Sequence, residues 1–317
     1  MTIRLYQCIM ACLESMKPIG HRRSLYKVVR AWNTLMYYVI SRLENILIMR
    51  TSIEMLTKRL SEERTSSQSD VYVTASLTTF PARIKEIRYV IMSILLQTVR
   101  PDRVLLWVAE DQFPNRQLPD NLRVLCDYGL EIRFCDDLRS HKKYYYALQE
   151  QKTNELVITF DDDIIYHPHT IERLIKKHNE YPNCIVCSQV HIMTFDERGQ
   201  LNPYHKWGSA HDNQDIPNKD YMPLTGSGCL YPCGIMPKVT FEKHKIRNIA
   251  FTADDLWIGA IAHINGVKIC PTAKVARMFS VVGDSQIESL SQVNCIGDGN
   301  DVTLGNLQRF FSFQNYQ

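Results

Sequence analysis

The sequence of 317 residues predicts an α/β fold, in which a mostly parallel sheet flanked by helices follows an N-terminal helical extension. Two observations favour this fold. Between residues 71 and 160, short apolar runs of strand length alternate with segments of helical character, which is the pattern of βαβ units. Between residues 25 and 47, the apolar residues fall at helical spacing. We therefore expect the sheet after residue 70 and a separate helical segment before it.

A composition of 45% hydrophobic and 22% charged residues is ordinary for a globular protein. The formal net charge of +3 is nearly balanced, which argues against a general nucleic-acid-binding protein. Residues 1 to 70 contain 11 Lys and Arg against 6 Asp and Glu, and subtracting these from the totals of 37 and 34 leaves 26 and 28. The basic excess therefore lies in the N-terminal segment, and no nucleic acid is expected among the partners.

The predicted N-terminal helix has one apolar face. Its longest uncharged stretch, residues 31 to 41, is too short to cross a bilayer, which requires about 20 apolar residues. Three roles stay open for residues 1 to 60. They could lie on an anionic membrane surface with Trp32, Tyr37 and Tyr38 at the interface, pack against the following domain, or pair with a second copy in a homodimer.

Residues 61 to 70 contain no apolar side chain and are expected to link this extension to a domain over residues 71 to 317. No signal-peptide cleavage site is recognisable, because the first apolar stretch is broken by Glu14, Lys17 and Pro18. The ten cysteines are scattered, so we expect free thiols in a reducing, cytoplasmic location.

Four of the cysteines, Cys184, Cys187, Cys229 and Cys233, could form a zinc site. The apolar residues between the first two favour a buried strand instead, in which cysteine serves as a small apolar residue.

The elements of the main domain follow in chain order from their local patterns. Strands are expected at 71–77, 103–108, 130–134 and 156–160, with helices at 83–96 and 142–149 and another soon after Pro168. Residues 189 to 225 are irregular and rich in His, Asn, Asp, Pro and Tyr, which indicates a functional loop or lid. Ligands of such sheets bind beyond the carboxyl ends of the strands.

The first of these strands ends in a polar corner. Thr78, Phe80 and Arg83 supply a hydroxyl, a planar ring and a cation where the chain turns into a helix. Such a corner suits a nucleotide base and phosphate, because a helix N-terminus and an arginine both favour an anion.

Two lysines, Lys142 and Lys143, open the helix that follows the third strand. Cations at a helix start oppose the macrodipole, so an anionic partner explains them better than helix stability does. A solvated basic turn stays open as the alternative.

Three consecutive carboxylates, Asp161, Asp162 and Asp163, follow the apolar strand at 156–160. Like charges this close repel unless a cation compensates them. If the strand geometry persists, Asp161 and Asp163 lie on one side, and two such carboxylates with phosphate and water match how Mg²⁺ or Mn²⁺ is held with a nucleotide. The alternative is a cap for the helix that follows Pro168.

A second acidic pair, Asp254 and Asp255, stands at the start of an apolar helix about ninety residues downstream. A capping box with Thr252 as the N-cap and Asp255 at the third position would explain it structurally. A carboxylate fixed there is also well held to accept a proton from an acceptor hydroxyl.

The four motifs together have a recognisable order: Ser-Leu-Thr-Thr-Phe-Pro-x-Arg, Phe-Asp-Asp-Asp, the segment from Gly226 to Pro232, and Thr-Ala-Asp-Asp-Leu-Trp. In this order the chain resembles the bacterial family-2-type glycosyltransferases, which have the GT-A fold, a Rossmann-like sheet. The resemblance covers about residues 71 to 310. It implies a nucleotide-binding half at 71–165 and an acceptor-binding half with a C-terminal tail at 166–317.

The resemblance also implies roles for individual residues. The triplet corresponds to the DxD motif, which binds the ribose and, through Mn²⁺ or Mg²⁺, the diphosphate of a nucleotide sugar, with Asp163 and then Asp161 as metal ligands. Asp255 corresponds to the general base, although Asp254 stands where the family more often has Glu and stays an alternative. The remaining donor-binding residues would be Thr78, Phe80, Arg83, Lys142, Lys143, Asp162 and the floor formed by Gly226, Ser227 and Gly228.

The implied reaction moves a sugar, from a UDP-sugar by family resemblance, to a hydroxyl of a glycan or lipid-linked glycan in bacterial capsule or lipopolysaccharide synthesis. It would be a metal-dependent, inverting hexosyl transfer, cytoplasmic or peripheral on the inner face of the cell membrane. A sugar nucleotidyltransferase and a non-catalytic glycan-binding protein are the alternatives. The segment from Gly297 to Asp301 either closes over the site or forms a surface turn.

Overall fold

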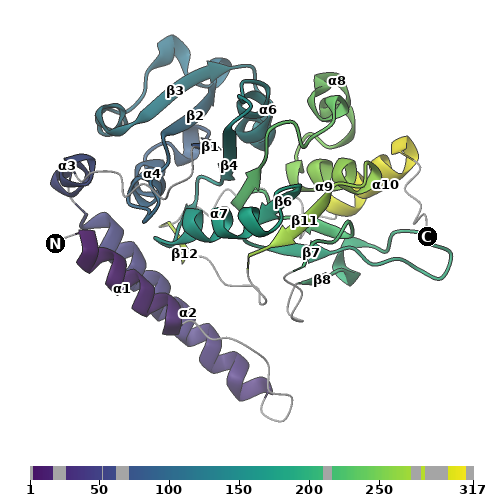
Figure 1. Cartoon of the computed structure of the whole chain (residues 1–317), viewed down its shortest axis with the longest axis horizontal. Coiled ribbons are helices and arrows are strands. Elements are labelled where there is room, and N and C mark those ends of the chain that lie inside the picture. The colour runs from purple at the N-terminus through teal and green to yellow at the C-terminus, as the bar shows by residue number, and fades with distance from the viewer. Residues whose placement is uncertain are drawn as a thin grey trace.

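The computed structural model describes residues 3–16, 26–51, 53–61, 71–209, 216–272, 280–282 and 299–311 (Figure 1). Its centre is a seven-stranded sheet in the order β11-β6-β10-β4-β1-β2-β3. The strands are β1 (Tyr72–Thr78), β2 (Arg103–Ala109), β3 (Leu130–Cys135), β4 (Glu155–Phe160), β6 (Cys184–Cys187), β10 (Ser227–Tyr231) and β11 (Lys268–Pro271). Only β10 runs antiparallel to its neighbours in this sheet, so the predicted α/β fold with a mostly parallel sheet is confirmed.

The central strands read as continuous apolar runs because helices cover both faces of the sheet. In β2, Val104, Leu106 and Val108 join the core on one face, whereas Leu105 and Trp107 join the core on the other. The first face is covered by α4 (Ile87–Leu95) and α7 (Thr170–Glu180), and the second by α6 (Lys142–Gln149), α8 (Lys243–Ile249), α9 (Asp254–Ile264) and α10 (Gly299–Phe311). A short helix, α5 (Asp120–Arg123), precedes β3.

The segment from 189 to 225 is more regular than expected. It contributes β7 (Val190–Ile192), β8 (Gly208–Ser209) and β9 (Tyr221–Pro223), which form an antiparallel sheet in the order β8-β7-β9. Strands of two or three residues are too short to show a periodic pattern, so the prediction of an irregular loop was wrong here.

Two other boundaries differ from the sequence-based expectation. The helix expected from Arg83 begins as a 3-10 turn at Pro81–Arg83, and α4 itself starts only at Ile87. At the C-terminal end, residues 299 to 301 open α10, so the surface-turn interpretation is wrong for them, and residues 297 and 298 lie outside the described residues.

The N-terminal helices are α1 (Ile3–Met16), α2 (Tyr26–Met49) and α3 (Ile53–Ser61). The prediction of a long helix over residues 25 to 47 is confirmed from residue 26 onward. Tyr6, Met10 and Ile48 belong to the same core cluster as strands β1 and β2, so these helices share a core with the sheet. The predicted linker, apart from its first residue, lies outside the described residues. Among the helices that the structure describes, none has the length and apolar character needed to cross a membrane.

A small ladder connects α2 to the segment that follows β4. Strand β5 (Ile164–Ile165) pairs with β12 (Ser280–Val281), and the Val282 amide donates to the Asp163 carbonyl at 2.8 Å. On the other side of β12, the Asn45 side chain of α2 donates to the Val281 carbonyl at 2.8 Å. The position of α2 is thereby linked to the backbone of the aspartate triplet.

Candidate active site

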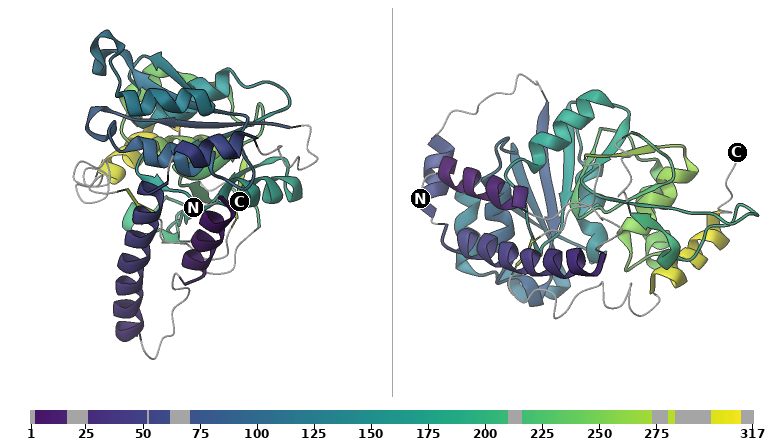
Figure 2. Two further views of the ribbon diagram at one scale, coloured as in Figure 1. Left: turned by 90° about the vertical axis from the view of Figure 1, so that its left-hand side faces the viewer. Right: turned by 90° about the horizontal axis from the view of Figure 1, so that it is seen from below.

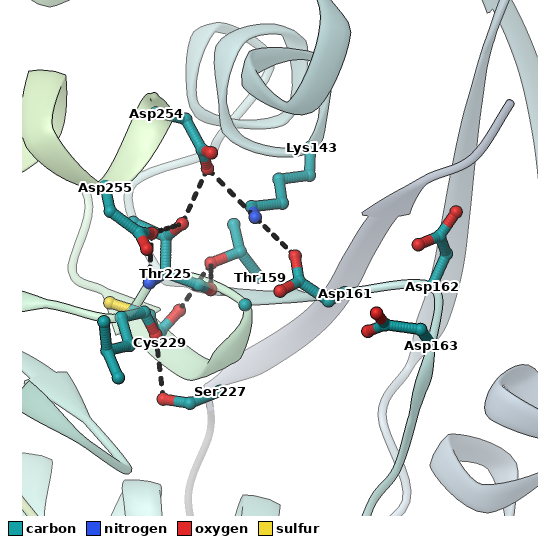
Figure 3. A network of polar contacts seen from close by, with 12 residues as sticks. Lys143, Thr159, Asp161, Asp162, Asp163, Thr225, Ser227, Cys229, Asp254 and Asp255 are labelled. Atoms are coloured by element: carbon teal, nitrogen blue, oxygen red, sulfur yellow. Dashed lines mark hydrogen bonds and ion pairs between the residues drawn. The ribbon is translucent and has the colours of Figure 1, made fainter. Parts of the chain in front are cut away.

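Four segments meet at the carboxyl end of β4 (Figure 3). They are the aspartate triplet that follows β4, the first turn of α6, the turn before β10 and the first turn of α9. Because β4 pairs with β1 on one side and with β10 on the other, the polar corner after β1 also borders this point. Ligands bind at this edge in sheets of this kind.

The Lys143 ammonium group joins the two acidic clusters. Its Nζ lies 2.6 Å from Asp161 Oδ1 and 2.9 Å from Asp254 Oδ2, and the side chain is only 3% exposed. Burial alone would lower the pKa of Lys143, but Asp161, Asp254 and Asp255 together raise it well above its usual value. Lys143 therefore carries the positive charge that stabilises both clusters, and the solvated basic turn considered for it is ruled out.

Thr225 holds the second acidic pair from the turn before β10. Its amide donates to Asp255 Oδ1 at 2.8 Å, and its hydroxyl lies 2.6 Å from Asp254 Oδ2 and 2.5 Å from Asp255 Oδ1. A hydroxyl has one hydrogen, so Thr225 can donate to only one of the two carboxyl groups at a time. Sequence reasoning missed Thr225, although it directly precedes the Gly-Ser-Gly segment that was singled out.

The pKa values of the two carboxyl groups in this pair are shifted in opposite directions. Burial and the neighbouring charge of Asp254 raise the pKa of Asp255 to about 7. Burial also disfavours the ionised form of Asp254, but Lys143 outweighs it and keeps the pKa of Asp254 well below its usual value. The pair therefore consists of a permanently ionised carboxylate and a group that exchanges a proton near neutral pH.

The capping box considered as an alternative for α9 does not match the observed start of the helix. The N-cap residue is Ala253, which makes no side-chain capping hydrogen bond. The carboxylates of the first helical turn point instead to Lys143 and Thr225. The acidic pair is therefore fixed by contacts with α6 and the turn before β10.

His141 lies next to the two lysines at the start of α6. It is fully buried, its Nε2 lies 2.8 Å from the Ala250 carbonyl and its Nδ1 lies 2.8 Å from the Tyr144 hydroxyl. Burial lowers the pKa of His141 to about 4, so the ring is neutral, and its contact with Ala250 connects the start of α6 to the end of α8.

Asp162 forms a separate contact with the corner after β1. Its two oxygens accept from the Thr79 hydroxyl at 2.7 Å and from Arg83 Nη1 at 2.5 Å. Burial raises the pKa of Asp162, and Arg83 opposes that rise. The same Arg83 nitrogen lies 3.1 Å from Asp163 Oδ2. The expected alternation of the triplet was therefore wrong: β4 ends at residue 160, and Asp162 and Asp163 meet the same guanidinium group.

Gly226 lies directly against Asp161. Its carbonyl accepts from the Asp161 amide at 3.2 Å and also from the Tyr166 hydroxyl. A Cβ atom at this position would lie 1.7 Å from Asp161 Oδ2, so no larger residue fits without moving the carboxylate. Gly228 has a φ of +95°, which favours glycine for a different reason. Ser227 is buried and donates to the Leu224 carbonyl at 2.8 Å.

Three of the predicted donor-binding residues contribute less directly. The Thr78 hydroxyl donates to the Trp107 carbonyl at 2.8 Å, and Phe80 lies with its ring centroid 5.4 Å from the Arg83 guanidinium carbon. Lys142 is buried and its Nζ lies 2.5 Å from Asp137 Oδ1, outside the Lys143 network. A solvated turn is therefore ruled out for Lys142 as well.

The Asp161 and Asp163 carboxylates could bind a divalent cation only if a bound ligand completed the coordination of that cation. No group of three or more His, Cys, Asp and Glu side chains in the described part of the chain is arranged to hold a metal ion. The Asp161 side chain is 41% exposed and that of Asp163 is 13% exposed. Mg²⁺ is commonly held by one or two carboxylates together with substrate phosphates and water, so each of these residues could supply a carboxylate ligand to such a cation.

No family model and no curated protein matches the sequence. Among solved structures, the chain is similar to 4-diphosphocytidyl-2C-methyl-D-erythritol synthase from Anaerococcus prevotii DSM 20548, with a TM-score of 0.42 and 11% identity over 74% of this chain and 100% of that chain. It is also similar to residues 1–349 of S. aureus TarS, with a TM-score of 0.43 and 13% identity over 77% of this chain and 72% of that chain. Both similarities concern the course of the backbone alone.

Proposed function

We propose that this protein is a glycosyltransferase that moves a sugar from a nucleotide diphosphate sugar to a hydroxyl group of a glycan acceptor. The observation that carries the proposal is the Lys143 bridge between Asp161 and Asp254, because it joins two acidic clusters from distant parts of the chain at the ligand-binding edge of the sheet. One of these clusters includes Asp255, whose pKa of about 7 suits a general base at neutral pH.

Asp255 takes the proton of the acceptor hydroxyl in this proposal. As the acceptor oxygen attacks the anomeric carbon, its proton passes to the Asp255 carboxylate, and the bond from that carbon to the donor diphosphate breaks. Direct displacement of this kind inverts the anomeric configuration. Asp254 stays ionised and holds Lys143 and Thr225 in place, so we assign it a positioning role.

The negative charge of the donor diphosphate is stabilised by cations at the end of β4. Asp163 and Asp161 would hold Mn²⁺ or Mg²⁺, which supplies positive charge to the departing diphosphate when it is bound. Arg83 and Lys143 add fixed positive charge beside these two carboxylates. Asp162, held by Thr79 and Arg83, keeps the triplet attached to the corner after β1.

The donor would extend from that corner toward Gly226. The Phe80 ring and the Thr78 end of β1 lie on the base side, and Gly226 gives the sugar a close approach beside Asp161. UDP-sugars are the first donors to test, and the acceptor class that we propose is a bacterial surface polysaccharide or its lipid-linked precursor.

Two substitutions test these roles separately. In calorimetric titrations, Asp163→Asn should weaken the Mn²⁺-dependent binding of the donor, whereas Asp255→Asn should bind donor normally. In a transfer assay, Asp255→Asn should be slower by about 10²- to 10⁴-fold. Full transfer activity in either variant would refute the role given to that residue.

The same titrations separate the alternative functions. A nucleotidyltransferase would bind a nucleoside triphosphate with a sugar phosphate and release pyrophosphate, and its phosphate loop usually contains glycine, which residues 78 to 83 lack. A non-catalytic glycan-binding protein would show no metal-dependent binding of any nucleotide sugar.

A further inference from the structure

Helix α2 has one packed face and one uncovered face. Ile40, Glu44 and Ile48, spaced four residues apart, are buried. This face packs on α1 and on the main domain, where Ile48 joins the core beneath the sheet. Together α1 and α2 extend away from the sheet, and among the described elements only α1 lies beside the far part of α2 (Figures 1 and 2).

The uncovered face carries a stripe of large apolar side chains, which we call the α2 stripe. All seven are exposed in the described structure: Trp32, Leu35, Tyr38, Val39, Leu43, Ile46 and Met49. Their spacing of three and four residues places them on one side of the helix over about 26 Å, at 1.5 Å per residue. Single exposed apolar residues are normal, but a continuous apolar stripe marks an interaction surface. The Tyr37 side chain lies outside the described side chains.

The charges on this face have one sign. Arg42 is exposed three residues after Val39, within the stripe, and Arg50 is exposed at the end of the helix. The sole acidic residue of α2, Glu44, is buried on the opposite face and accepts a hydrogen bond from the Ser280 hydroxyl. The α2 stripe therefore combines apolar side chains with arginines and contains no carboxylate.

This combination favours one occupant over another. Two copies of the stripe packed against each other would bury arginines without a carboxylate from either stripe to pair with them. An anionic membrane surface satisfies both components, since apolar side chains enter the headgroup region while arginines extend to the phosphates. Trp32 and Tyr38 are also the aromatic types that prefer the membrane interface.

We propose that the α2 stripe binds the surface of an anionic lipid membrane, with α2 lying in the plane of the interface. The proposal depends on the α2 stripe alone and is independent of the glycosyltransferase function. It gives each face of α2 one of the roles considered for the N-terminal helices: packing for one face and membrane binding for the other.

Tryptophan fluorescence of the full-length protein tests the proposal directly. Trp32 is 60% exposed, whereas Trp107, Trp207 and Trp257 are buried, so a solvent-dependent change in emission reports on the stripe. Vesicles of phosphatidylcholine with phosphatidylglycerol should shift the emission to shorter wavelength, and brominated lipids should quench it. Phosphatidylcholine vesicles alone should give a smaller response, and added salt should weaken binding to the anionic vesicles.

Matched variants show whether the stripe is responsible. The double variant Leu35→Glu with Leu43→Glu should reduce co-sedimentation with anionic vesicles about tenfold or more, because it removes apolar contacts and adds repulsive charge. Val302→Glu replaces an equally exposed apolar residue on α10 and should leave binding unchanged. Trp32→Phe should still bind in co-sedimentation but lose the fluorescence response. Circular dichroism confirms that each variant is folded.

Three results would overturn the proposal. The first is that anionic vesicles cause neither an emission shift nor co-sedimentation. The second is that the Leu35→Glu, Leu43→Glu variant binds vesicles as well as the unchanged protein does. The third is that the unchanged protein binds no vesicles but has twice the monomer mass in solution, and that the double variant is monomeric. The last result would assign the stripe to a second copy of the chain.

Discussion

Replacing Asp255 with asparagine should make the protein less active and more stable at once. The amide is nearly the same size as the carboxyl group, and its oxygen can still accept from the Thr225 amide that now lies 2.8 Å from Asp255 Oδ1. The variant therefore removes a charge and a proton acceptor without opening a cavity. Loss of a general base typically reduces the rate by about 10²- to 10⁴-fold.

The gain in stability follows from the direction of the pKa shift. Burial and Asp254 raise the pKa of Asp255 from 3.8 to about 7. A rise of roughly three units corresponds to about 4 kcal/mol at 1.36 kcal/mol per unit, which is an upper bound because the side chain is partly exposed to solvent. Since the folded pKa is the higher one, the stability that the protonated carboxyl group contributes is fully present below pH 3.8 and is lost as the pH rises toward 7. We expect Asp255→Asn to be more stable than the unchanged protein by about 1 to 3 kcal/mol at pH 8 and nearly equal to it at pH 4.

Thermal and urea unfolding followed by circular dichroism at the two pH values measures this difference. Asp254→Asn is the matched control with the opposite sign, because the pKa of Asp254 is lowered by Lys143 and its ionised form stabilises the fold. That variant should be destabilised at pH 8. If Asp255→Asn is destabilised at pH 8 as strongly as Asp254→Asn, or if it retains activity, the assignment of the raised pKa and of the base to Asp255 is wrong.

Further predictions concern the contacts around this pair. Gly226→Ala places a Cβ atom 1.7 Å from the present position of Asp161 Oδ2, so donor affinity measured by calorimetry should fall at least tenfold, and unchanged affinity would remove Asp161 from the donor site. Lys143→Met leaves Asp161 and Asp254 without their shared cation and should cost about 3 to 5 kcal/mol in urea unfolding, whereas a loss below 1 kcal/mol would contradict the bridge. Asn45→Ala removes the hydrogen bond from α2 to β12 and should lower the free energy of unfolding by about 1 kcal/mol. An unchanged free energy of unfolding would contradict this contact.

The main sheet could be predicted from the sequence because its strands are buried on both faces. Strands β1, β2 and β4 each stand out as an apolar run, whereas the edge strand β3 shows alternating apolar and charged residues. The predicted helix over residues 142 to 149 matches α6 residue for residue. The strands of the small sheet could not be predicted, since two or three residues give no periodicity. Likewise, the division of α2 into a packed face and an uncovered face depends on the position of β12, a segment more than two hundred residues away.

The residues of the candidate site could be predicted from the sequence, but the contacts between them could not. The aspartates, Gly226 and the lysines were all evident as motifs, whereas the partners of Lys143 come from segments 18 and 111 positions further along the chain, which no local pattern reveals. Two adjacent aspartates also look alike in a sequence. Only the position of Lys143 beside Asp254 shows that Asp255 has the higher pKa.

The binding of nucleotide sugars to the full-length protein, measured by calorimetry with and without Mn²⁺, tests the central claim most directly. A panel of uridine, guanosine and cytidine nucleotide sugars should include one, most simply a UDP-sugar, that binds at least tenfold more tightly with Mn²⁺. Asp163→Asn should abolish that difference. If no nucleotide sugar binds, or if the Asp163→Asn variant binds with the same dependence on Mn²⁺, then the joined acidic clusters are not the donor site of a glycosyltransferase.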